Sequence, residues 1–186
     1  MTLDLGQWIV IGFCAALIIG YIHGYYYNCK KAEKILSWLR PGLEKWGKVT
    51  AGEKLAGMAT GGRLAVSQSM APFRRIEAIY LLEPRENLLF WLFHRLQGRR
   101  DELVLKITLP KASRTEIEVK RHGRSDFTTP VKNGSEQIKV FLERHGRAVF
   151  HLALRRGQPN LFVQAHLPEL MSEPAEAFLT ALQGLA

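Results

Sequence analysis

Charged side chains are almost absent from the first part of this 186-residue sequence. Residues 5–29 contain no Asp, Glu, Lys or Arg, and none of the 26 lysines and arginines comes before Lys30. A cleaved signal peptide needs a basic start and a small-residue cleavage site, whereas tyrosines occupy residues 25–27. A helix of roughly 20 apolar residues crosses a bilayer. We therefore expect residues 1–29 to form a retained transmembrane anchor.

Residues that carry out chemistry are also scarce. Cys14 and Cys29 are too few for a disulfide framework or a cysteine-based zinc site. The six histidines show no HExxH motif and no pair at four-residue spacing, so no metal site is predicted. Only Asp101 and Asp126 are aspartates beyond the anchor, which are few for acid–base chemistry. We expect a protein that is not an enzyme and that has no cofactor and no small-molecule substrate.

The charges beside the apolar segment predict its orientation. Asp4 precedes the segment, whereas Lys30, Lys31 and Lys34 follow it. Basic residues are retained on the cytoplasmic side of a membrane, so the N-terminus is expected outside or in the lumen and residues 30–186 in the cytoplasm. Aromatic side chains typical of membrane interfaces mark both ends of the segment, Trp8 at the first end and Tyr21, Tyr25, Tyr26 and Tyr27 at the second.

The part of the chain after the anchor is strongly basic. Residues 30–168 contain all 26 lysines and arginines but only 13 of the 17 acidic residues. Such a domain at a membrane face attracts anionic lipid headgroups or a polyanion such as ribosomal RNA. A solvated basic face is the alternative interpretation. The candidate residues for binding headgroups or a polyanion are Lys30, Lys31, Lys34, Arg74, Arg75, Arg99 and Arg100.

Hydrophobic periodicity predicts an α+β fold: a single N-terminal transmembrane helix, then a cytosolic antiparallel sheet with packed helices. Residues 30–48 read as a juxtamembrane amphipathic helix that Pro41 kinks or interrupts, and residues 49–186 as the cytosolic domain. Residues 50–62 read as a loop, and Ser172 as the N-cap of a closing helix through residue 185. Strands are expected at residues 63–69, 75–82, 103–109, 115–120, 137–142, 148–154 and 161–167, with a turn near residues 71–72 and the strand 115–120 paired with 103–109.

Residues 84–98 predict a helix with an unusual centre. Pro84 and a glutamate lie in its first turn, and Gly98 follows a basic last turn. Residues 88–93 are apolar on every side, so the helix is expected either to be deeply buried or to face lipid partly. Its candidate partner-binding residues are Leu88, Trp91 and Leu92.

The stretches within residues 19–44 and 82–109, and the one that begins at residue 161, together resemble the coiled-coil domain-containing protein 47 (calumin) family. The first comprises residues 19–24, Asn28 and residues 31–44, across the end of the anchor and the following helix. The second and most specific comprises residues 82–109, which is similar to the helix-then-strand block of the family without gaps. The third is the strand at residues 161–167 with Pro168 and a short helix.

The resemblance implies an accessory factor for membrane-protein insertion. Family members belong to the PAT complex, an intramembrane chaperone that includes the small membrane protein Asterix and acts beside the Sec translocon and the ribosome. Membrane lipids, a Sec-type translocon, the ribosome and an Asterix-like protein are therefore the expected partners. The sequence has no counterpart of the acidic lumenal segment or the C-terminal coiled coil, so calcium binding is not expected. The membrane would be the endoplasmic reticulum or a prokaryotic plasma membrane. The alternative function is a membrane-tethered scaffold or a module that binds lipid surfaces.

Overall fold

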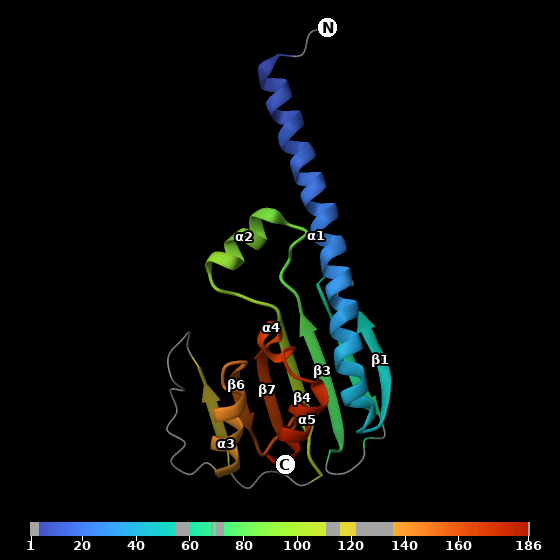
Figure 1. Cartoon of the computed structure of the whole chain (residues 1–186), viewed down its shortest axis with the longest axis vertical. Coiled ribbons are helices and arrows are strands. Elements are labelled where there is room, and N and C mark those ends of the chain that lie inside the picture. The colour runs from blue at the N-terminus through green and yellow to red at the C-terminus, as the bar shows by residue number, and fades with distance from the viewer. Residues whose placement is uncertain are drawn as a thin grey trace.

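An antiparallel β-sheet covered by helices, with one long helix extending well beyond it, makes up the protein (Figure 1). This computed structural model describes residues 4–54, 60–67, 69, 73–110, 116–121 and 136–185. The combination of a long apolar N-terminal helix and an antiparallel sheet with packed helices confirms the α+β class.

The long helix is α1 (Leu5–Glu44), which joins the predicted anchor and the predicted amphipathic helix without a break. Asp4 caps its N-terminus, because the Asp4 carboxylate accepts the backbone N–H of Leu5 at 2.8 Å. Pro41 lies within the last turn and does not interrupt the helix. Its 40 residues extend for about 60 Å. The helix is long and apolar enough, by length and composition, to cross a membrane.

Seven strands form one sheet in the order β1-β2-β3-β4-β7-β6-β5, and every neighbouring pair is antiparallel. The sheet is built from β1 (Lys48–Lys54), β2 (Gly61–Ser67), β3 (Arg75–Leu81), β4 (Glu102–Thr108), β5 (Ile117–Lys120), β6 (Val149–Leu154) and β7 (Leu161–His166). The predicted hairpin of β2 and β3 and the predicted strands β4, β6 and β7 are confirmed, with ends shifted by one or two residues.

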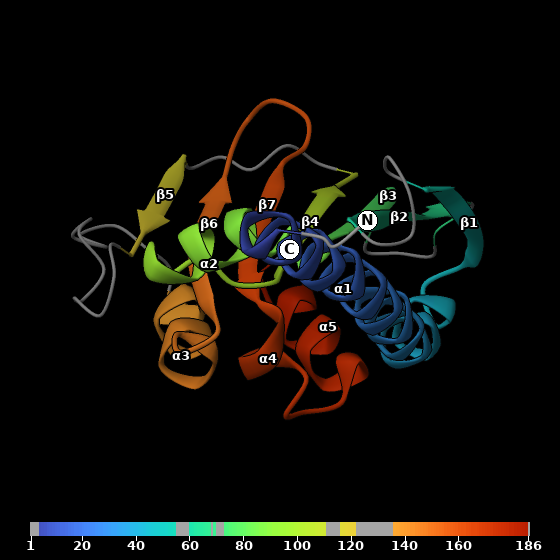
Figure 2. The ribbon, with the colours of Figure 1, turned by 90° about the horizontal axis from the view of Figure 1, so that it is seen from above.

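The remaining helices are α2 (Leu88–Leu96), α3 (Glu136–His145), α4 (Leu167–Leu170) and α5 (Ala175–Gln183). In the view from above, α1, α3, α4 and α5 lie on the same face of the sheet (Figure 2). The core lies between these helices and the sheet, because their apolar faces are removed from water together. Its members with at most 1% exposure include Ile35, Leu39 and Leu43 of α1, Leu105 and Ile107 of β4, and Phe178 and Leu182 of α5.

Two predictions for the second half of the chain are wrong. Residues 137–142 form part of helix α3 rather than a strand, because Ile138, Phe141 and His145 are buried at the three- and four-residue spacing of a helix. β5 pairs with β6 at the sheet edge rather than with β4, since β3 and β7 occupy both sides of β4.

Other predictions differ locally from the structure. The expected loop at residues 50–62 contains most of β1 and the first two residues of β2, because the pairing of these strands prevails over the weak strand propensity of glycine and alanine. Pro174 rather than Ser172 is the N-cap of α5, and the Ser172 hydroxyl donates to the carbonyl of Glu169 at 2.7 Å. The expected turn at residues 71–72 lies outside the described residues.

Candidate functional site

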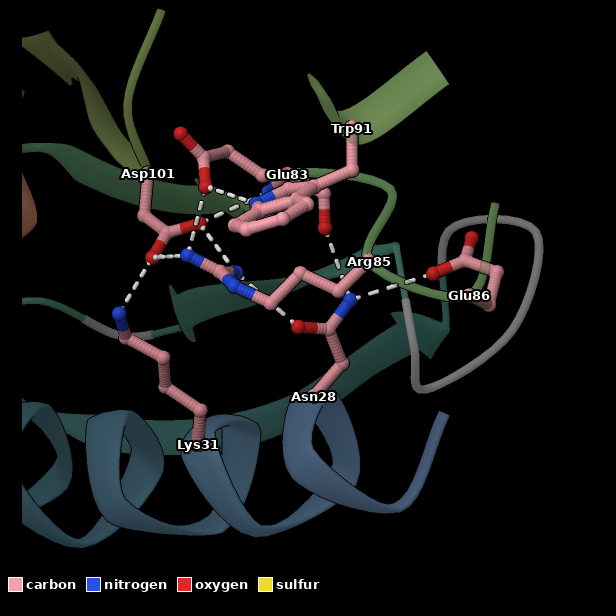
Figure 3. Close-up of polar contacts among 7 residues, drawn as sticks. All are labelled: Asn28, Lys31, Glu83, Arg85, Glu86, Trp91 and Asp101. Carbon is pink, nitrogen blue, oxygen red and sulfur yellow. Dashed lines mark hydrogen bonds and ion pairs between the residues drawn. The ribbon is translucent and has the colours of Figure 1, made fainter. Parts of the chain in front are cut away.

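A polar cluster joins α1 to the segment that leads from β3 to α2 (Figure 3). Arg85 is at its centre, and its guanidinium donates to both carboxylate oxygens of Asp101, at 2.9 and 3.0 Å. The same guanidinium donates to Glu83 Oε2 at 2.8 Å and to Asn28 Oδ1 at 3.0 Å. Lys31 of α1 forms a further ion pair with Asp101. Two acidic and two basic side chains therefore neutralise one another at the contact between α1 and the sheet domain.

Hydrogen bonds to the backbone and to α2 complete the cluster. Asn28, which is fully buried, donates to the carbonyl oxygen of Glu83 at 2.8 Å and to Glu86 Oε2 at 3.3 Å. The backbone N–H of Glu83 donates to Asp101 Oδ1 at 2.7 Å. The indole of Trp91 in α2 donates to Glu83 Oε2 at 3.1 Å. The cluster thus fixes α1, the segment before α2 and α2 itself to one another.

The electrostatics of the cluster are those of a structural contact. Burial acts to raise the pKa of Asp101, but hydrogen bonds from Arg85, Lys31 and the Glu83 backbone outweigh it and hold that pKa below its usual range. Burial acts to lower the pKa of Arg85, and the hydrogen bond to Asp101 prevails and raises it. Asp101 therefore stays ionised with its acceptor sites occupied, so it is unsuited to proton abstraction.

Two glycines allow α1 to approach this segment closely. A Cβ on Gly24 would lie 2.0 Å from the carbonyl oxygen of Arg85, and one on Gly20 would lie 2.3 Å from Cδ1 of Leu88. Gly24 is the stricter requirement, because its neighbour is backbone rather than the end of a flexible side chain. The face of α1 that meets the domain carries small or polar residues at four-residue spacing: Gly20, Gly24, Asn28 and Ala32.

α2 is the most exposed apolar element of the described domain. It begins at Leu88 rather than at Pro84, because the Asn87 side chain accepts the backbone N–H of Phe90 at 3.1 Å as the N-cap. None of its nine residues is buried, so deep burial, the first of the two alternatives given for this helix, is wrong. Five large apolar side chains are more than half exposed: Leu89 at 66%, Phe90 at 56%, Leu92 at 52%, Phe93 at 57% and Leu96 at 80%.

A groove with a volume of about 690 Å³ separates the first half of α2 from α1. Leu17, Ile18 and Tyr21 of α1 form one wall, and Leu88 and Phe90 of α2 form the other. All three α1 residues belong to the uncharged stretch at residues 5–29. The groove is therefore mainly apolar and lies at the level of the uncharged part of α1. Glu86 and Asn87 supply polar groups at one edge.

Two basic clefts lie next to α1 and share Tyr27, Lys31 and Pro168. The first has a volume of about 680 Å³ and is lined by Lys30, Lys31 and Lys34 together with α4 and the residues that follow it. The second has a volume of about 480 Å³ and brings Arg95 from the end of α2 together with Arg99 and Arg100. The two clefts form a continuous basic zone beside the groove.

The predicted basic residues fall into separate environments. Lys30, Lys34 and Arg99 are exposed in the basic zone, whereas Lys31 is paired with Asp101 and Arg100 with Glu169. Arg74 and Arg75 lie away from the basic zone, because they are at the start of β3. The other end of β3, which pairs with the start of β4, is the end that leads to α2.

The predicted interface residues of α2 are likewise divided. Leu88 packs against Gly20 of α1, Trp91 is bonded to Glu83, and Leu92 is exposed on the outer side. The main role of Trp91 is therefore structural. Leu88 faces the groove, and Leu92 faces away from the protein.

Asn28, Glu83, Arg85 and Asp101 are not among the functional residues that the sequence predicts, although all four lie in the stretches that carry the family resemblance. The sequence contains a signal for three of them: Glu83 and Arg85 precede the apolar residues of α2, and Asp101 follows them. Within the described ranges, no group of three or more histidine, cysteine or acidic side chains is arranged to hold a metal ion. Comparison of the chain with protein-family models and with curated proteins gave no match.

Proposed function

We propose that this protein is a non-catalytic, single-pass membrane protein that assists membrane-protein insertion. In this role, the groove between α1 and α2 would hold an apolar segment of another membrane protein. The observation that carries the proposal is the position of the groove, which has one wall in the uncharged part of α1 and the other in an exposed apolar helix. An apolar groove at that level is surrounded by lipid when α1 spans the membrane.

The proposed topology follows from charge and from the direction of α1. The uncharged stretch would cross the bilayer with Asp4 outside or in the lumen, and the sheet domain would lie in the cytoplasm. Lys30 and Lys34 would then lie at the cytoplasmic surface, one to three turns after the tyrosines at residues 25–27. This arrangement supports a domain held directly against the membrane rather than at the end of a linker, because α1 continues into the core.

The dimensions of the groove fit one side of a helix. A helix about 10 Å across rises about 5.4 Å per turn, so one turn occupies roughly 420 Å³. The groove volume of about 690 Å³ therefore matches one to two turns. Association between helices in lipid depends on close packing and on hydrogen bonds between polar side chains. Leu17, Ile18 and Leu88 would supply the packing, and Asn87 at the edge would offer a hydrogen-bonding partner to a polar residue of the bound segment.

The family resemblance supports insertion as the process that this contact serves. Expected partners are a Sec-type translocon, the ribosome and a small Asterix-like membrane protein. The commitment of Asp101 to Arg85 and Lys31 supports a non-catalytic role, because this buried carboxylate is already neutralised by cations.

Site-specific photo-crosslinking in native membranes tests this proposal. A photoreactive residue replaces Leu17 or Phe90 in the groove, and in a control protein it replaces Val140, an exposed apolar residue of α3. Newly made proteins are labelled with a short radioactive pulse and then chased, and crosslinked peptides are mapped by mass spectrometry. We expect groove positions, but not Val140, to crosslink to apolar membrane segments of newly made proteins, with yields that fall during the chase.

Two results would overturn the proposal. A crosslink to the membrane segment of one protein that is unchanged by the chase identifies a scaffold rather than an insertion factor. Adducts only with lipid, or equal protein adducts from Val140, show that the groove is not a protein-binding site.

A further inference from the structure

The outer face of α2 points away from the protein. Leu89, Leu92, Phe93 and Leu96 lie within one sector of roughly 100° on the helix surface. Trp91 lies on the opposite side, where its indole donates to Glu83 of the polar cluster (Figure 3), and Leu88 lies beside the outer sector, against Gly20 of α1. In the described part of the chain no element packs over the outer sector, which leaves four large apolar side chains more than half exposed.

The level of α2 along α1 indicates what surrounds this face. α2 connects the end of β3 to the start of β4. It lies beyond these strand ends, beside α1 (Figure 1). Leu88 and Phe90 meet α1 at residues 17–21, whereas Trp91 and Arg95, further along α2, line a cavity together with Gly24 and Tyr27 of α1. With α1 across the membrane, α2 therefore extends from the acyl chains, about 15 Å before Lys30, to the level of the tyrosines at residues 25–27, next to the headgroups.

Basic side chains lie where such a helix would meet the headgroups. Arg95 is in the last turn of α2, and Arg99 follows it in the return to β4; both line the cleft of about 480 Å³. Neither guanidinium forms an ion pair with another residue that the structure describes. The carboxylates in the same cleft, Glu83 and Asp101, are paired with Arg85 and Lys31. Excess positive charge therefore remains in the cleft, as a phosphate requires.

We infer that α2 is an interfacial helix embedded in the cytoplasmic leaflet, and that the cleft beneath its basic end binds the phosphate of an anionic phospholipid through Arg95 and Arg99. An apolar face with cations at its border is the arrangement by which interfacial helices bind membranes. The inference rests on the proposed membrane span of α1, but not on the proposed role in insertion. The domain would thus have a second membrane contact, which fixes its rotation about α1.

Spin-label accessibility in the full-length protein tests the position of α2. Single cysteines replace Leu89, Phe93, Val140 or Phe13 in a background with Cys14→Ser and Cys29→Ser, and the labelled proteins are reconstituted into lipid nanodiscs. Oxygen partitions into the bilayer and a nickel complex stays in water, so the ratio of their relaxation effects reports depth. Val140 is the matched control, because it and Phe93 are both 57% exposed on short helices. Phe13, in the uncharged part of α1, reports whether α1 spans the membrane.

The expected result is preferential oxygen access at Phe13, Leu89 and Phe93, and preferential nickel access at Val140. A label at Phe13 in lipid with labels at Leu89 and Phe93 as wet as Val140 overturns the interfacial helix and leaves the membrane span intact. A wet label at Phe13 overturns the membrane span and the inference together.

Charge reversal tests the phosphate site. Nanodiscs contain phosphatidylcholine with phosphatidylglycerol, and the lipids retained by the extracted protein are counted by native mass spectrometry. Arg95→Glu/Arg99→Glu should reduce retention of phosphatidylglycerol by at least about fivefold for each cation removed. Arg74→Glu/Arg75→Glu, the same charge change at the other end of β3, should leave retention unchanged. If the charge-reversed protein fails to fold, Arg95→Gln/Arg99→Gln, which removes the two charges without reversing them, replaces it in the same measurement. Equal retention by all variants, or a loss of bound RNA without a loss of lipid, overturns the phosphate assignment.

Discussion

Arg85 and Asp101 form a bidentate ion pair in which Nη1 and Nη2 lie 2.9 and 3.0 Å from the two carboxylate oxygens. The pair joins the segment before α2 to the residue that precedes β4, and Asp101 is only 1% exposed. Through Asn28 and Lys31 it also holds α1. The position of α2 relative to α1 therefore depends on a buried, balanced set of charges rather than on apolar packing alone.

Removal of one partner of this pair should be costly. Asp101→Asn or Arg85→Met removes one charge from the balanced cluster and leaves a buried charge of the opposite sign uncompensated, so each should lower the free energy of unfolding by about 3–5 kcal/mol. Arg85→Met/Asp101→Leu should cost less than the two single changes added together, because it removes one charge of each sign and the remaining charges of Glu83 and Lys31 still balance. Urea unfolding of the full chain in detergent micelles, followed by tryptophan fluorescence, measures these differences.

The matched control for that series is Arg63→Gln, which removes a more exposed ion pair with Glu77 at 2.9 Å. Its cost should be about 1 kcal/mol or less. If Asp101→Asn costs no more than Arg63→Gln, the cluster does not hold the domain together.

Acid should weaken the fold through Asp101. Its pKa is lower in the folded protein than the value of about 3.9 expected for an unfolded chain. Its contribution to stability is therefore complete above that unfolded value and is lost as pH falls through the lower folded pKa. As the pH falls from about 5 to about 3, across the unfolded pKa of Asp, the free energy of unfolding should decrease more for the wild type than for Asp101→Asn. Parallel pH profiles for the two proteins would show that Asp101 has no special role.

Gly24→Ala should separate α1 from the segment before α2. The added methyl group would lie 2.0 Å from the carbonyl oxygen of Arg85, so the backbone must shift and the hydrogen bonds of Asn28 must lengthen. We expect a loss of about 1–3 kcal/mol in unfolding free energy, in the range of overpacking substitutions. Gly12→Ala is the control on the same helix, since no atom lies within 4 Å of the position of its Cβ. Equal stability of the two variants would argue against the close contact.

Asn160→Ala should reduce stability without affecting the site. The Asn160 side chain accepts the N–H of Leu109 at 3.0 Å and donates to the carbonyls of Arg155, Arg156 and Gly157. Their loss should cost about 1–3 kcal/mol. The lipid depth of a label at Phe93 should not change, because Asn160 lies in the connection between β6 and β7. A change in that depth would show that the position of α2 depends on the whole sheet.

The elements that could be predicted from the sequence are those whose pattern is local. The strand at β4 shows alternating burial of Leu103, Leu105 and Ile107, and α1 shows helical spacing of Ile35, Leu39 and Leu43. The pairing of strands that are distant in the chain leaves no such local pattern in the sequence. β5 pairs with β6 across more than 25 residues of sequence, and β-branched and aromatic residues concealed the helical period of α3.

The polar cluster could not be predicted for a similar reason. Asn28 and Glu83 are 55 residues apart, and only the fold brings their atoms within 2.8 Å. The sequence does not separate Lys31 from its neighbours Lys30 and Lys34, yet Lys31 is turned toward Asp101 while the other two are exposed. One turn of a helix can thus contain both an internal ion-pair partner and exposed cations, and the sequence alone does not distinguish them.

The contact of α2 with the apolar part of α1 creates the proposed binding groove, and a disulfide between Gly20→Cys and Leu88→Cys would form only if that contact exists in the membrane. Cγ of Leu88 lies 2.8 Å from the Cβ position of residue 20, so the two Cβ atoms are at most about 4.3 Å apart, within disulfide range. In native membranes, in the background with Cys14→Ser and Cys29→Ser, a mild oxidant should join this pair within one chain. It should not join Gly12→Cys with Leu88→Cys, because residue 12 lies about 12 Å further along α1. Failure of the first pair to form the bond, or equal formation by both pairs, would contradict the account.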